Sequence, residues 1–198
     1  KVFVMRIFLS ILLLIFSLQS WTKADDITDF LIEGMSVGDS LLDYMSKDEI
    51  KYNDLEFHPS SSKYYAVNFN GKTNTYEYVD FYIKRGDKKY EIFFIRGIVG
   101  VNNKTKCLKL KNKIAEEMKE LFKLAKFQEG KINHYIYKKS VQHISQFYYG
   151  KDARFNDAAR VECLYVSEED KKEFNITSSS VQVIIQKGGD FAKWFNAL

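Results

Sequence analysis

The sequence predicts an α+β fold: a single domain with an antiparallel sheet, one long amphipathic helix packed on it, and short helices at both ends. Residues 64–99 alternate apolar and polar side chains around a short glycine-containing turn, which is typical of an antiparallel hairpin. Residues 109–126 change to a helical period. No Pro- or Ser-rich linker marks a change of composition after residue 24, so one domain is expected.

The first 24 residues have the pattern of a cleavable export signal. Lys1 and Arg6 form a basic start, residues 7–18 are apolar apart from two serines, and Thr22-Lys23-Ala24 places small residues before a cleavage point. A membrane-spanning helix needs about 20 apolar residues, so no stable membrane anchor is expected after cleavage. We therefore expect a signal peptide over 1–24 and an exported domain, periplasmic or secreted, over 25–198.

Two capping-box patterns predict short helices in the segment that follows. A serine hydroxyl in this motif accepts a backbone N–H, and a carboxylate three residues later reaches back to the serine backbone. Ser40 with Asp43 and Ser46 with Glu49 fit this spacing. The expected helices cover 40–46 and 47–52, and a loop is expected over 57–63.

Alternation predicts strands over 64–69, 76–84 and 89–99, with a turn at 85–88. In the second strand, Glu77, Val79, Phe81 and Ile83 share one face. The returning strand is expected to keep Tyr90, Ile92, Phe94 and Ile98 in register.

The other face of the second strand carries a group of tyrosines that we interpret as a candidate binding face. Its members are Tyr76, Tyr78 and Tyr82. Aromatic rings on a sheet can stack on a sugar or a peptide, and they also serve as core under a covering layer. Both interpretations remain open from the sequence.

The clearest helix spans 109–126, where apolar side chains recur every three or four residues. Its expected buried stripe contains Leu110, Ile114, Met118, Leu121 and Ala125. Beyond it, the patterns favour strands over 132–137, 141–149, 160–166 and 180–186, a solvated connection over 168–173, and a last helix capped by Asp190.

Cys107 and Cys163 predict one disulfide, because an exported chain with an even cysteine count favours pairing. Such a bridge would contribute about 4 kcal/mol in the chain-entropy description. Two buried thiols, or pairing between molecules, are the alternatives.

Charge and residue spacing exclude several function classes. The signal segment holds three of the 30 Lys and Arg residues and none of the 26 Asp and Glu residues, so the remainder carries a net charge of about +1. Nucleic acid is therefore not an expected partner. The histidines His58, His134 and His143 lack a metal-ligand spacing, and no metal or cofactor is expected.

Gly38-Asp39-Ser40-Leu41 resembles the motif of the GDSL hydrolases, in which the serine is the nucleophile. The resemblance implies a catalytic Ser40 with a histidine base. The Asp-x-x-His block of that family has no counterpart, because Leu55, Lys131 and Ser140 lie three residues before the histidines. We therefore expect Ser40 to cap a helix.

The stretch from Asp29 to Tyr44, with its Ile32-Glu33-Gly34-Met35-Ser36 core, resembles the opening of a group of small exported proteins from AT-rich marine alphaproteobacteria. The similarity continues through the tyrosine-rich hairpin and both cysteines. That group has no assigned activity, so the resemblance implies export and no mechanism.

Three function classes follow. The expectation is a non-enzymatic binding or structural envelope protein, with an envelope protein, a peptide or a glycan as partner. A secreted inhibitor directed at a partner protein is the first alternative. A GDSL-type serine hydrolase using Ser40 is the second.

Overall fold

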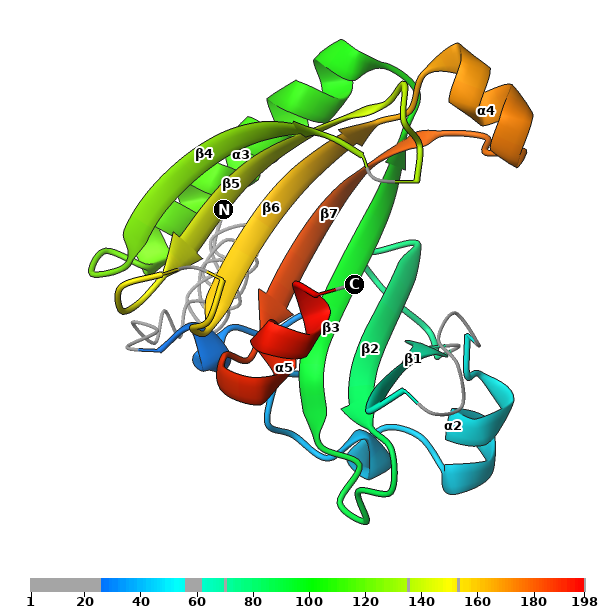
Figure 1. The fold of residues 1–198 in the computed structure, drawn as a ribbon, viewed down its shortest axis with the longest axis vertical. Coiled ribbons are helices and arrows are strands. Elements are labelled where there is room, and N and C mark those ends of the chain that lie inside the picture. Colours follow the sequence, from blue (N-terminus) through cyan, green and yellow to red (C-terminus); the bar gives the residue numbers. More distant parts are fainter. Residues whose placement is uncertain (1–25, 56–61, 70, 135, 153, 198) are drawn as a thin grey trace, which may run out of the picture.

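The computed structural model describes residues 26–55, 62–69, 71–134, 136–152 and 154–197, so the predicted signal peptide and His58 lie outside the described residues. One seven-stranded antiparallel sheet forms the centre, in the order β1-β2-β3-β7-β6-β5-β4 (Figure 1). The strands are β1 Tyr64–Phe69, β2 Tyr78–Lys84, β3 Ile92–Val101, β4 Lys126–Asn133, β5 Val141–Tyr148, β6 Ala158–Tyr165 and β7 Ser179–Gln186.

Helices lie at both ends of the chain and between the strands. They are η1 Ile27–Asp29, η2 Leu41–Asp43, α2 Lys47–Tyr52, α3 Lys104–Leu121, α4 Glu168–Phe174 and α5 Gly189–Phe195. This arrangement confirms the predicted α+β fold with one long helix and short terminal helices. Within the described ranges, no helix is both long enough and apolar enough to cross a membrane.

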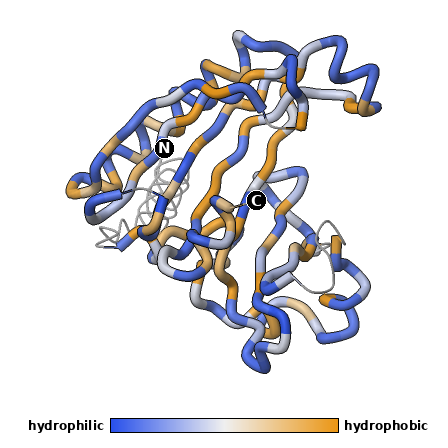
Figure 2. The backbone as a smooth tube through the Cα atoms, in the orientation of Figure 1, coloured by the Kyte–Doolittle hydropathy of each residue, from blue (hydrophilic) through white to orange (hydrophobic). Residues whose placement is uncertain are grey.

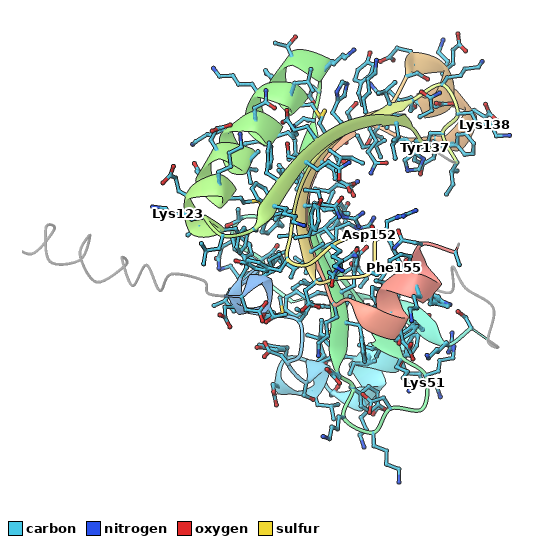
Figure 3. All side chains as sticks on the ribbon, turned by 60° about the vertical axis from the view of Figure 1, so that its left-hand side comes forward. Lys51, Lys123, Tyr137, Lys138, Asp152 and Phe155 are labelled. Carbon is cyan, nitrogen blue, oxygen red and sulfur yellow. A yellow bond between two sulfur atoms is a disulfide. The ribbon has the colours of Figure 1, made fainter. Side chains whose placement is uncertain are left out.

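The sheet is curved, and its two sides are covered differently. The turned view shows α3 and the N-terminal segment on the convex side, and α5 on the concave side (Figure 3). The convex side holds the larger apolar core, to which the N-terminal segment contributes Ile32 and Leu41, the sheet Phe81 and Ile185, and α3 Met118. Apolar residues follow the central strands, whereas many of the outer turns are hydrophilic (Figure 2).

Helix α3 starts and ends earlier than its spacing predicts. Asn103 caps it, with Oδ1 accepting the Lys106 N–H at 2.9 Å. The fully buried side chains are Cys107, Lys111, Ala115 and Met118. The expected stripe faces the core, with Met118 buried and Leu110, Ile114, Leu121 and Ala125 partly buried against it. The most deeply buried side is turned slightly towards Cys107 and Lys111.

The β2–β3 hairpin contains a bulge that the alternation does not reveal. Tyr82 pairs with Phe94, but Ile83 pairs with Ile92, so Phe93 is the extra residue. As a result Ile92 joins the convex core while Phe94 joins a smaller cluster on the concave side. The expected common register of Ile92, Phe94 and Ile98 is therefore wrong at the bulge.

The predicted strand 132–137 is also displaced, because β4 runs over Lys126–Asn133. All eight of its residues are exposed, and it is the last strand of the sheet. An edge strand with no fully buried side chain has no clear apolar alternation to detect. The strands predicted at 141–149, 160–166 and 180–186 are confirmed as β5, β6 and β7.

Two C-terminal elements correct the prediction. The expected connection 168–173 is the helix α4, in which Ser167 Oγ accepts the Asp170 N–H at 3.1 Å. The cap of α5 is Gly188, with no side-chain hydrogen bond, and not Asp190. Asp190 lies in the first turn of α5 and pairs with Lys63 at 3.2 Å.

Helix α5 covers only one end of the concave face. Phe191 packs there against Tyr64, Tyr82 and Phe94, with Trp194 at the margin. The loop with Asp152 and Phe155 lies beside α5 (Figure 3). The remaining concave face has no apolar cluster among the described residues, and its side chains are mainly polar.

Candidate functional site

A band of polar side chains crosses the concave face from β2 to β5. Strand pairing places them on the side opposite to α3, since paired residues share a face. We call this set the polar strip. Its members are Asp80, Arg96, Gln142, Arg160, Glu162, Gln182 and Gln186.

Asp80 and Arg96 form the first half of the polar strip. Arg96 Nε donates to Asp80 Oδ1 at 3.0 Å, and Arg96 Nη2 makes a second, shorter contact with Asp80 Oδ2. Arg96 Nη1 lies 3.5 Å from Gln182 Oε1. Burial alone would lower the pKa of Arg96, but the Asp80 carboxylate outweighs it and the pKa lies above its ordinary value.

Glu162 is the centre of the second half and is only 2% exposed. Its carboxylate accepts from Gln142 Nε2 and lies 3.5 Å from Arg160 Nε. Arg160 Nη2 donates to Gln186 Oε1 at 3.1 Å. Arg160 Nε is buried and makes no hydrogen bond within the described part of the chain, so its contact with Glu162 is that of an ion pair.

The buried ion pairs of the polar strip contribute little to the stability of the sheet relative to an apolar core. Burying charged groups costs desolvation free energy, and apolar residues of similar volume often stabilise a protein equally well or better. The polar strip holds two cations and two anions on a face that no helix covers beyond α5. Asp80 and Glu162 are buried, whereas the side chains of Arg96 and Arg160 remain 28% and 16% exposed. The two arginines, held in place by these carboxylates, are therefore the groups that a polar partner can reach.

The three predicted site tyrosines do not form one exposed face. Tyr78 lies on the concave face and is 59% exposed. Tyr82 is buried beneath α5. Tyr76 precedes β2, and its ring packs on the convex side against Gly97, where an added Cβ would lie 2.5 Å from Tyr76 Cδ1. Only Tyr78 remains available for stacking.

His134 and Tyr137 stand at the end of the concave face distant from α5, where Tyr137 is labelled in Figure 3. Their rings stack with centroids 4.6 Å apart. His134 Nδ1 accepts the Tyr137 N–H at 3.1 Å, so Nε2 carries the proton of the neutral ring. Burial lowers the pKa of His134, which favours this neutral form.

The predicted disulfide is confirmed. The sulfur atoms of Cys107 and Cys163 are bonded, with Cα atoms 5.6 Å apart, and the bridge ties the first turn of α3 to β6. Both side chains are fully buried, so the bridge is part of the convex core.

Ser40 is engaged in backbone contacts. Its Oγ donates to the Lys89 carbonyl at 2.7 Å and accepts the Leu42 N–H at 3.3 Å. It therefore caps η2 without the predicted reciprocal contact from Asp43. The second predicted capping box is present in full, because Ser46 Oγ accepts from Glu49 N and Glu49 Oε2 accepts from Ser46 N.

The described residues hold no group of three His, Cys, Asp or Glu side chains arranged to bind a metal ion. Comparison of the chain with protein-family profiles, with curated proteins and with solved structures finds no match.

The polar strip was not predicted from the sequence, although a signal for it was present. Arg160 and Glu162 occupy alternate positions of a predicted strand, and Gln182 lies on the next strand. Charged residues at alternate positions on a central strand indicate that one face of that strand is not apolar core. Which strands bring these residues together depended on the sheet order.

Proposed function

We propose that this chain is an exported, non-enzymatic binding protein that holds a glycan on the polar strip. The observation that supports the proposal most directly is the position of Tyr78. It pairs with Ile98 on the concave face, two residues from Asp80, and its ring is exposed beside a network of fixed hydrogen-bonding groups. Sugars are bound by this combination of a ring for stacking and planar polar groups for hydroxyls.

The charge of the polar strip favours an uncharged partner. Asp80 and Glu162 balance Arg96 and Arg160, so the strip offers donors and acceptors in similar number without a net field. A nucleic acid or an anionic lipid surface would require an excess of Lys and Arg. Neutral hydroxyl groups both donate and accept hydrogen bonds, which matches a strip that carries donors and acceptors side by side.

Export is proposed on two observations. The pattern of residues 1–24 is that of a signal peptide, and disulfides persist mainly in oxidising compartments outside the cytoplasm. Mass spectrometry of the protein recovered from the periplasm or medium should find Asp25 at its N-terminus. Recovery of the uncut chain from the cytoplasm alone would contradict export.

A glycan array, followed by titration of the best glycan, tests the binding function. Tyr78→Ser should weaken binding by about tenfold, because a stacked ring and its buried area are lost. Tyr52→Ser is the matched control, since Tyr52 is 87% exposed on α2, outside the polar strip. Equal affinity of the two variants, or no glycan bound on the array, would reject the proposal.

The ion pair is tested with a double substitution, because removing one charge leaves its partner buried. Arg96→Met alone should destabilise the fold by about 3 kcal/mol. Asp80→Leu with Arg96→Met should restore most of that loss while leaving glycan binding weakened. A double variant that binds as tightly as the parent protein would show that the pair has only a structural role.

A further inference from the structure

A cavity on the convex side lies between α3 and the strands β4 and β5, on the opposite face of the sheet from the polar strip. Its volume is about 590 Å³, within the usual range for sites of small molecules. Leu108 and Ala115 give it an apolar wall. Its polar groups come from Lys111, Asn112, Glu116, Lys119, Glu129 and His143, of which Glu116 and Lys119 form an ion pair at 2.8 Å. We call this cavity the α3 pocket.

The ammonium of Lys111 is the unusual feature of the α3 pocket. Lys111 belongs to the sheet-facing stripe of α3 and is only 4% exposed. Its Nζ lies 3.1 Å from Glu129 Oε1 and 3.3 Å from Asn112 Oδ1. An ammonium has three donors, so one N–H remains without a described acceptor. A buried lysine with an unused donor is costly unless another group completes its coordination.

The imidazole of His143 supplies a second unused group. Its Nε2 is buried and has no hydrogen-bond partner among the residues that the structure describes. His143 pairs with Cys163 across β5 and β6, so its ring lies on the convex side, as Lys111 does. Burial, and then the positive charges of Lys104, Lys131 and Lys111, lower the pKa of His143, so the neutral imidazole is favoured.

The contacts of Glu129 show that a carboxylate is bound at this position of the α3 pocket. One of its oxygens, Oε1, accepts from both Lys111 Nζ at 3.1 Å and Ser145 Oγ at 2.9 Å. The Glu129 side chain is 60% exposed and lies on the edge strand β4, whereas that of Lys111 is 5% exposed. The donors are therefore fixed, and the carboxylate is the more accessible partner.

We propose that the α3 pocket binds a small organic carboxylate. The carboxylate accepts the third N–H of Lys111 and the Nε2–H of His143, and the apolar part of the ligand lies against Leu108 and Ala115. Glu129 shares the Lys111 ammonium with the ligand, and its negative charge opposes the bound carboxylate at short range.

Benzoate is the probe, and benzamide is its neutral control of nearly the same shape. The ¹⁵N signal of His143 Nε2, assigned by its loss in His143→Gln, should shift on titration with benzoate and stay in place with benzamide. Inorganic phosphate tests whether any anion suffices. No shift with benzoate, an equal shift with benzamide, or a response to phosphate alone would each overturn the proposal.

Three variants test the assigned roles. Lys111→Met should reduce benzoate affinity by about tenfold or more, because a charge-assisted hydrogen bond is lost. Lys113→Met should leave it unchanged, since Lys113 lies on the solvent side of the same helix, paired with Glu117. Glu129→Gln should raise the affinity by about threefold or more, because a competing negative charge is removed.

The other variants keep the proposal testable if Lys111→Met does not fold. If Lys111→Met does not fold, as a thermal melt would show, two other variants test the site by calorimetric titration with benzoate. Glu129→Gln should gain affinity, and His143→Gln should lose it, because the Nε2–H donor is removed. Unchanged affinity in Glu129→Gln would then reject the effect of the Glu129 charge and with it the assigned carboxylate position.

Discussion

Glu33 Oε1 accepts the backbone N–H of Thr75 at 2.7 Å, and this contact joins the N-terminal segment to the residues that precede β2. The same carboxylate accepts the N–H of Tyr76 at 3.2 Å and, through Oε2, that of Asn74 at 3.0 Å. Burial alone would raise the pKa of Glu33, but the backbone donors, with Thr75 first among them, lower it below its ordinary value of 4.5.

Glu33→Gln should reduce the free energy of unfolding by about 1–2 kcal/mol at neutral pH, because an amide offers one acceptor oxygen where the carboxylate offers two. Urea denaturation measures this loss. The matched control is Glu173→Gln, on the exposed side of α4. An unchanged midpoint in Glu33→Gln would show that the three N–H groups find other acceptors.

The contacts of the Glu33 carboxylate with these backbone N–H groups also predict how the stability of the fold changes at acidic pH. Since the pKa of Glu33 is lowered in the folded state, its contribution is present above the unfolded pKa. It is lost as the pH falls through the folded pKa, below about 4.5. Stability measured across this range should therefore fall less steeply in Glu33→Gln than in the parent protein, and parallel curves would contradict the assignment.

Reduction of the Cys107–Cys163 disulfide should lower the free energy of unfolding by about 4 kcal/mol, because the two cysteines are 56 positions apart and the open chain regains loop entropy. Thermal melts with and without reductant measure the change. A variant with both cysteines replaced by serine should be less stable than the oxidised parent protein, and reductant should not change its stability. If reductant destabilised that variant by the same amount, the effect of reductant on the parent protein would not come from the disulfide.

Ser40 is predicted to act as a structural cap. Ser40→Ala should cost about 1 kcal/mol of unfolding free energy. Ser40→Asn should be tolerated better than Ser40→Asp, because the Lys89 carbonyl needs a donor that a carboxylate lacks. A serine-directed fluorophosphonate probe should leave the protein unlabelled, and stoichiometric labelling of Ser40 would instead support the hydrolase alternative.

The raised pKa of Tyr76 predicts how the stability of the fold changes at alkaline pH. Burial, and then the nearby Glu33 carboxylate, raise the pKa of Tyr76 to about 12. The folded state thus retains the phenolic proton longer than the unfolded state, so stability falls as the pH rises from about 10 towards 12. Tyr76→Phe should reduce this fall, as measured by chemical denaturation at several pH values. An identical slope in the variant would indicate that other tyrosines dominate.

The prediction from the sequence succeeded where a structure depends on residues within a few positions of each other. The capping box of Ser46 with Glu49 forms α2, and alternation from Tyr64 to Phe69 forms β1. The pairing of the cysteines also followed from their number. These signals are local or compositional, so they do not depend on which strands become neighbours.

Only the tertiary structure decided which side chains face each other across the sheet. The bulge at Phe93 moves Ile92 and Phe94 to opposite faces, and Gly97 provides space for the Tyr76 ring on the convex side. The polar strip exists because β7 lies between β3 and β6, which aligns Arg96, Gln182 and Glu162. Strand order and register arise from pairing between distant residues, and a shift of one residue exchanges the two faces. The local elements of this protein could therefore be predicted from its sequence, whereas the polar strip and the α3 pocket arise from long-range packing.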